Sequence, residues 1–248
     1  MKLHKVKPKY ILKSNPRIGL ITLGSDFRIE KDFNNVIYGK DIDLYVNRIH
    51  CYNPLTNETL AKMADDITDV TKEILPDQKM ECVAYGCTSG TVAVGYETIR
   101  SKINLAKPDA KVTTPITSTI KALKKFDIKK ISIFTPYTKT INDSVVNYFK
   151  KENISVNSLT YFDIASDLDI GKVDENYLFE VLSKIDLEDS DALFVSCTAL
   201  PVLSIIDKLE KKLNKIILSS NQTLIWDALH LIGNKDPVVG FGKIFEVN

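Results

Sequence analysis

Two cysteines lie where a short apolar run gives way to a polar turn. Cys87 follows VAYG and opens the string CTSG, and Cys197 follows LFVS and opens CTALP. At such a turn the free amides and the dipole of the next helix favour a thiolate, so we expect the pKa of each thiol to fall from about 8.5 toward neutrality. Both cysteines are therefore candidate catalytic groups.

A single buried cysteine is more often a small packing residue than a catalyst. Cys87 and Cys197, however, occupy equivalent places in an internal repeat with an offset of about 110 residues, and each precedes a threonine. We predict that the two thiols reach one carbon from opposite sides. One thiol would remove a proton while the other donates one, or one would add as a nucleophile while the other acts as an acid. Cys51 and Cys82 have no partner in the repeat and are assigned to packing.

Short apolar runs alternate with stretches of helical period, which is typical of parallel sheets covered by helices. We expect strands near 17–23, 43–49, 81–86, 111–114, 130–135, 155–162, 191–196 and 215–219. We expect helices near 27–37, 57–75, 91–105, 116–126, 138–151, 174–185, 202–213 and 223–232. The repeat predicts an α/β fold with two pseudosymmetric parallel-sheet domains and an active site in the cleft between them. Residues 1–115 plus 220–248 would form the half with Cys87, and 116–219 the half with Cys197.

Ligands of parallel α/β sheets bind beyond the carboxyl ends of the strands, where side chains and the first amides of helices can hold an anion. The candidates for binding a carboxylate substrate at these ends are Ser25, Thr88, Ser89, Tyr137, Thr198 and Asn221. Tyr137 fits an oxyanion donor as well as it fits a core ring. Asp26 is expected to cap the helix that follows it.

The charges are balanced, with 33 Lys and Arg against 32 Asp and Glu. This composition favours neither a nucleic acid nor a membrane surface as a partner. There is no run of about 18 apolar residues and no signal-peptide pattern at the N-terminus, so we expect a cytoplasmic protein. The four cysteines lack C-x-x-C spacing and the three histidines are distant in sequence, so neither a metal site nor a disulfide framework is expected.

The whole pattern resembles the aspartate/glutamate racemase superfamily. The similarity is to the branch with maleate cis-trans isomerases, arylmalonate decarboxylases and ectoine-utilisation proteins of the EutA type. It covers nearly the whole chain and rests on GLITLGSDFRIEKDF, NPLTNETLAKM, YGCTSGTVAVG, TTPITSTIKAL, IFTPYT, LFVSCTALP and SSNQTLIWDAL. The resemblance implies a small carboxylate substrate, no metal or organic cofactor, and a homodimer or tetramer.

The resemblance also implies roles for individual residues. In that family the cysteines matching Cys87 and Cys197 are the catalytic pair, and the positions matching Thr88, Ser89 and Tyr137 hold a carboxylate or an enediolate. Decarboxylases of the branch retain only the cysteine that matches Cys197. The presence of both cysteines therefore points to an isomerase or a racemase.

One loop departs from the pattern of the maleate isomerases. They usually place an asparagine in the first strand-end loop, where this chain has the residues LGSD from 23 to 26. The hypothesis is therefore a cofactor-independent isomerase or racemase of a small carboxylate, either a dicarboxylate or an amino-acid derivative. Two alternatives stay open: a decarboxylase with Cys197 as the proton donor, and a non-catalytic carboxylate-binding protein.

Overall fold

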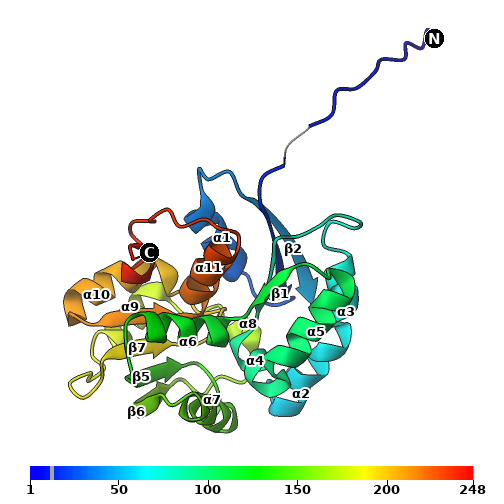
Figure 1. The fold of residues 1–248 in the computed structure, drawn as a ribbon. Helices are drawn as coiled ribbons and strands as arrows, with labels where there is room; N and C mark the ends of the chain where they lie inside the picture. The colour runs from blue at the N-terminus through cyan, green and yellow to red at the C-terminus, as the bar shows by residue number, and fades with distance from the viewer. Residues whose placement is uncertain (12–13, 248) are drawn as a thin grey trace.

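Two four-stranded parallel sheets form the framework of the computed structural model, which describes residues 1–11 and 14–247 (Figure 1). The first sheet has the order β2-β1-β3-β4, with β1 (Arg17–Leu23), β2 (Asp43–Ile49), β3 (Cys82–Gly86) and β4 (Lys111–Thr113). The second has the order β6-β5-β7-β8, with β5 (Lys130–Thr135), β6 (Ser155–Tyr161), β7 (Ala192–Val195) and β8 (Ile216–Ser219). The identical strand order confirms the predicted fold of two similar parallel α/β units.

The inner strands are apolar because helices cover both faces of each sheet. Every residue of β3 and of β7 is buried, whereas the edge strands β2 and β6 are largely half-buried or exposed. The helices in the first part of the chain are α1 (Ile29–Ile37), α2 (Asn57–Lys62), the 3₁₀ helix η1 (Met63–Asp66), α3 (Ile67–Lys72), α4 (Thr88–Val94), α5 (Tyr96–Ala106) and α6 (Pro115–Lys125). Those that follow are α7 (Lys139–Lys151), α8 (Asp167–Ile170), α9 (Glu175–Leu182), η2 (Leu203–Ile205), α10 (Ile206–Leu213), α11 (Ser220–Leu231) and η3 (Lys243–Phe245).

The largest differences from the predicted elements are at helix boundaries. The helix expected at 91–105 begins three residues earlier, because the Cys87 side chain caps it, and it is interrupted at Gly95. Gly95 has a φ of 88°, a conformation that glycine adopts without the steric cost of a side chain. The helix expected at 223–232 begins at Ser220, because Ser219 and Gln222 form a capping box there. The helix expected at 57–75 is divided into α2, η1 and α3, and the short helix α8 was not predicted.

Helix α11 joins the two units. It follows β8 of the second sheet, yet it packs against α6, α1 and β3, and Figure 1 shows it beside α1. Its residues from Ser220 to Leu229 are all buried. The division of the chain into 1–115 plus 220–248 and 116–219 stays a prediction.

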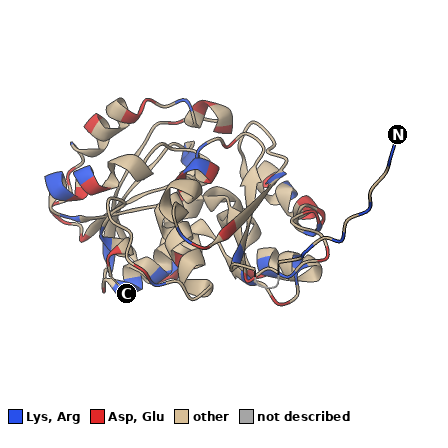
Figure 2. Cartoon of the chain, turned by 90° about the horizontal axis from the view of Figure 1, so that it is seen from above, with Lys and Arg blue, Asp and Glu red and all other residues tan. Residues whose placement is uncertain are grey.

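The outer surface carries both signs of charge. Figure 2 shows Lys and Arg interspersed with Asp and Glu over the outer helices. Within the described part of the chain, no helix combines the length and the apolar character that crossing a bilayer requires.

A buried carboxylate fixes α11 to β4 and α6. Asp227 accepts hydrogen bonds from Thr113 Oγ1 at 2.6 Å and Ser118 Oγ at 3.2 Å, and Lys121 Nζ lies 2.7 Å from the same oxygen. Removal of the carboxylate in Asp227→Ala would leave buried hydroxyls unpaired and should lower the free energy of unfolding by about 2–4 kcal/mol. Urea denaturation measures this change.

Asp143→Ala is the matched control, because Asp143 forms an exposed pair with Lys139. It should change the free energy of unfolding by less than about 0.5 kcal/mol. Equal effects of the two substitutions would show that the Asp227 network does not fasten α11.

Candidate active site

Cys87 lies at the junction of β3 and α4 and caps the helix with its own sulfur. Its Sγ accepts the Gly90 N–H at 3.2 Å and lies 3.9 Å from Ser89 Oγ. The side chain is only 3% exposed. A Cβ at position 90 would come within 2.8 Å of this sulfur and 3.1 Å of Tyr85 Oη, so glycine is needed there for the thiol to keep its place.

Cys197 follows β7 in a strained conformation. Its φ is 96°, in the left-handed region that residues with a side chain rarely adopt, at a cost on the order of 1–3 kcal/mol. Its backbone N–H donates to Ser220 Oγ at 3.0 Å, and its side chain is 5% exposed. Strain of this kind persists only where the surroundings hold the chain in place, and it is concentrated at functional sites.

The Ser220 hydroxyl connects the two cysteine loops. It accepts the Cys197 N–H and also the hydroxyl of Thr88, which lies 2.8 Å away. A second link runs from Thr198 Oγ1 to the Gly86 carbonyl at 3.3 Å. The loops from the two sheets are therefore joined directly. The Thr88 hydroxyl, predicted to bind substrate, donates to Ser220 here, and its role in substrate binding stays a prediction.

Tyr137 lies close to both sulfurs. Burial raises its pKa well above 10, and the neighbouring charges of Cys197 and Cys87 raise it further. Ser196 Oγ donates to the phenol oxygen at 3.3 Å. The phenol thus keeps its proton and can donate a hydrogen bond beside the thiols.

The expected lowering of the thiol pKa values is wrong for this structure. Burial raises the pKa of Cys87, and the Gly90 N–H lowers it only in part. Burial likewise raises the pKa of Cys197, followed by the charge of Asp167, while the Ala199 N–H lowers it. Desolvation disfavours the charged form and here exceeds the effect of the helix amides.

Asp167 of α8 also lies at this site, although it was not among the predicted site residues. It is 3% exposed, and Ser25 Oγ donates to its Oδ2 at 2.5 Å. Burial raises its pKa to about 6, the Ser25 hydrogen bond lowers it, and the charge of Asp26 raises it. Its place beyond the carboxyl end of β6 is a signal that could have identified it, because the other candidates come from the same edge of the sheets.

Asp26 caps α1 as expected, since its Oδ1 accepts the N–H groups of Arg28 at 2.8 Å and Ile29 at 3.1 Å. It also belongs to the acidic surroundings of the thiols, because its charge raises the pKa of Cys197. Burial raises the pKa of Asp26 itself. These hydrogen bonds to α1 use only one of the two carboxylate oxygens of Asp26.

Asn221 braces the Cys197 loop against α1. Its Nδ2 donates to Asp32 Oδ2 and to the Thr198 carbonyl, both at 2.8 Å. The structure thus brings Ser25, Thr88, Ser89, Tyr137, Thr198 and Asn221 around Cys87 and Cys197. Ser220, Tyr85 and Asp167 join them and were not among the predicted site residues. In the part of the chain that the structure describes, no three His, Cys, Asp or Glu side chains gather to hold a metal ion.

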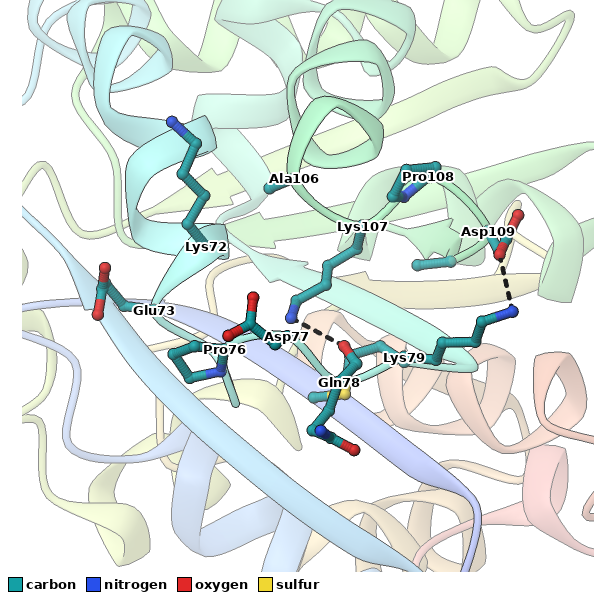
Figure 3. Close-up of a pocket in the computed structure, with 12 residues that line it drawn as sticks. Lys72, Glu73, Pro76, Asp77, Gln78, Lys79, Ala106, Lys107, Pro108 and Asp109 are labelled. Atoms are coloured by element: carbon teal, nitrogen blue, oxygen red, sulfur yellow. Dashed lines mark hydrogen bonds and ion pairs between the residues drawn. The ribbon is translucent and has the colours of Figure 1, made fainter.

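A surface groove of about 460 Å³ lies elsewhere (Figure 3). The residues that line it precede β3 and β4, so it is at the amino ends of these strands, away from the cysteines. Lys107 donates there to the Leu75 and Gln78 carbonyls, at 3.0 and 2.9 Å. Since ligands of parallel sheets bind at the carboxyl ends, this groove is not the candidate active site.

The buried Asp167 carboxylate should make stability depend on pH. Its pKa in the folded chain, about 6, exceeds the ordinary 3.8, so its favourable contribution is complete below about pH 4 and is lost as pH rises through 6. Asp167→Asn should therefore stabilise the protein at pH 7.5 by on the order of 3 kcal/mol relative to its effect at pH 4. Thermal unfolding at both pH values measures this difference.

The control is Asp169→Asn in the same helix, where an exposed carboxylate pairs with Lys172. It should give no gain in melting temperature at pH 7.5. If the effect of Asp167→Asn on stability were the same at both pH values, folding would not raise the pKa of the Asp167 carboxyl.

Comparison with known proteins agrees with this architecture. The maleate isomerase of Alcaligenes faecalis is 24% identical over 241 residues, which cover 92% of this chain and 95% of that protein. The crystal structure of the Pseudomonas putida S16 maleate isomerase with maleate superposes with a TM-score of 0.85 at 21% identity, covering 93% of this chain and 97% of the other.

A third relative is the maleate cis-trans isomerase of Nocardia farcinica, whose structure contains a covalently bound succinylcysteine intermediate. It has a TM-score of 0.85 at 19% identity and covers 93% of this chain and 98% of the other. The family model described as arylmalonate decarboxylase matches residues 40–245. The chain therefore belongs to the arylmalonate decarboxylase family, in the branch of the aspartate/glutamate racemase superfamily that also contains the maleate isomerases.

Proposed function

We propose that this protein is a cofactor-independent isomerase or racemase of a small carboxylate, with Cys87 and Cys197 as its catalytic pair. The observation that carries the proposal is the Ser220 bridge, which joins the loops that carry the two cysteines, one from each sheet. The family supports it as well, since relatives along nearly the whole chain are named maleate isomerases.

Two reactions fit this pair. In proton transfer, the thiolate of one cysteine takes the proton from the substrate carbon and the thiol of the other delivers its own proton to the opposite face. The pair ends with its charge exchanged, and the carbon is inverted. In the addition reaction, a thiolate forms a bond to one carbon of a carbon–carbon double bond, and the π electrons move to the other carbon and its carboxylate. The remaining single bond rotates, and the same electron pair re-forms the double bond as the thiolate leaves. The N–H groups of Gly90 and Ala199, which lower the thiol pKa values, stabilise whichever thiolate forms.

Charge that develops on the substrate needs hydrogen-bond donors in an enclosed site. We assign this role to the Tyr137 hydroxyl, the Ser89 hydroxyl and the first amides of α4 beside Cys87. Thr88 acts through its bond to Ser220 and positions the loop. Ser25, Thr198 and Asn221 complete the walls. A cytoplasmic location and a homodimer or tetramer stay predictions of this proposal.

A second candidate is decarboxylation with Cys197 as the proton donor, because the matching family model is that of arylmalonate decarboxylase. In that reaction a carboxylate leaves as carbon dioxide and the Cys197 thiol protonates the resulting carbanion. Cys87 would then be dispensable. Carbon dioxide release from phenylmalonate by Cys87→Ala at the wild-type rate would support this candidate over the pair.

Substitution of either cysteine tests the pair directly. Cys87→Ala and Cys197→Ala should each lower turnover by roughly 100- to 10,000-fold, because each removes one of two obligatory proton carriers or the nucleophile. NMR measures the rates as exchange of the substrate α-proton in D₂O and as conversion of maleate to fumarate.

Cys82→Ala is the matched control, since Cys82 is also a buried free thiol but lies at the opposite end of β3 from Cys87. It should keep nearly the wild-type rate. Full turnover in both Cys87→Ala and Cys197→Ala would rule out the thiol mechanism.

A further inference from the structure

Two buried carboxylates lie beside the thiols. Asp26 is 1% exposed and Asp167 is 3% exposed, and their charges act on Cys197. Among residues 1–11 and 14–247, neither forms an ion pair with a Lys, Arg or His side chain. Buried charges in proteins are normally paired, so these two are exceptions that need an explanation.

The nearest arginines are held by other groups. Arg28 donates through Nε and one terminal nitrogen to the Gly171 carbonyl. Arg48 donates to the Leu23 and Asp26 carbonyls and pairs with Glu30. The charge of Arg48 lowers the pKa of Asp26, but neither guanidinium forms an ion pair with Asp26 or Asp167.

The surroundings of Asp26 contain more hydrogen-bond acceptors than donors. Asp26 Oδ2 and Asn221 Oδ1 are buried, and no described residue donates to either. Both side chains border the Thr198 segment. Asn221 donates to the Thr198 carbonyl, and the Thr198 hydroxyl lies near Asp26 but donates its single proton to the Gly86 carbonyl at 3.3 Å. Structural roles account for the other atoms of these groups, namely the cap of α1 for Asp26 and the brace to Asp32 for Asn221. The unpaired Asp26 Oδ2 and Asn221 Oδ1 therefore indicate a ligand that donates hydrogen bonds to them.

We propose that the substrate carries a protonated amine in addition to its carboxylate, and that Asp26, Asp167 and the Asn221 side-chain oxygen recognise this ammonium group. An ammonium has three N–H donors and one positive charge, which matches a set of acceptors that contains two carboxylates. A dicarboxylate without an amine would instead bring two more negative charges to an acidic enclosure. The inference rests on the proposed function, because it assigns the substrate class of the same site.

Matched pairs of ligands that differ by the ammonium test this specificity. The probes are L- and D-aspartate against succinate, and L- and D-glutamate against glutarate, with binding measured by isothermal titration calorimetry. The wild-type protein should bind at least one amine-bearing member more tightly than its partner by roughly tenfold or more, as expected for one charged contact.

Asp26→Asn and Asp167→Asn should each reduce this preference to within about threefold, because an amide keeps the oxygen that caps α1 or accepts from Ser25 but loses the charge. Asp169→Asn, an exposed substitution in the same helix, should leave the preference unchanged. Preferred binding of succinate or glutarate by the wild type would overturn the inference, and so would an amine preference that survives in both Asn variants.

This experiment is independent of turnover. If the wild type prefers the amine-free acids while Cys87→Ala and Cys197→Ala lose activity, the ammonium inference fails and the proposed function stays. If the amine preference depends on Asp26 and Asp167 while both cysteine variants keep full activity, the recognition site is supported and the thiol mechanism fails.

Discussion

One hydroxyl holds the candidate site together. Ser220 Oγ accepts the Cys197 N–H and the Thr88 hydroxyl, so the loops that carry the two cysteines share a single acceptor. Ser220 can do so because it opens α11, which leaves the second sheet and packs against the first. The bridge also explains how the chain tolerates the positive φ of Cys197, since hydrogen bonds on both sides of the residue fix its conformation.

The surroundings of the thiols favour function over stability. Burial raises the pKa of Cys87 and Cys197, and the nearby carboxylates of Asp26 and Asp167 are buried without ion pairs among the described residues. The strained backbone of Cys197 lowers stability further. Such features cluster where chemistry requires a fixed, desolvated arrangement, and the rest of the two sheets supplies the stability that offsets them.

The related structures have the same framework, with TM-scores of 0.85, although only about one residue in five is identical to this chain. The framework is kept by buried strands and by the packing of helices, whereas substrate choice depends on a few side chains in the loops at the strand ends. In this chain Asp26 and Asp167 give those strand ends an acidic character. The fold and the substrate are therefore separate questions.

The sequence alone determined the strands and the duplicated order of elements, and it singled out Cys87 and Cys197 as candidates, because apolar runs and repeats are local patterns. The cap role of Asp26 was predictable for the same reason. Only the tertiary structure decided the direction of the thiol pKa values, since burial depends on what covers a side chain. It alone revealed Ser220 and Asp167, because the bonds from Ser220 to Thr88 and from Ser25 to Asp167 join residues more than 100 positions apart. Contacts between such distant positions depend on how the two sheets pack together, so no single stretch of sequence predicts them.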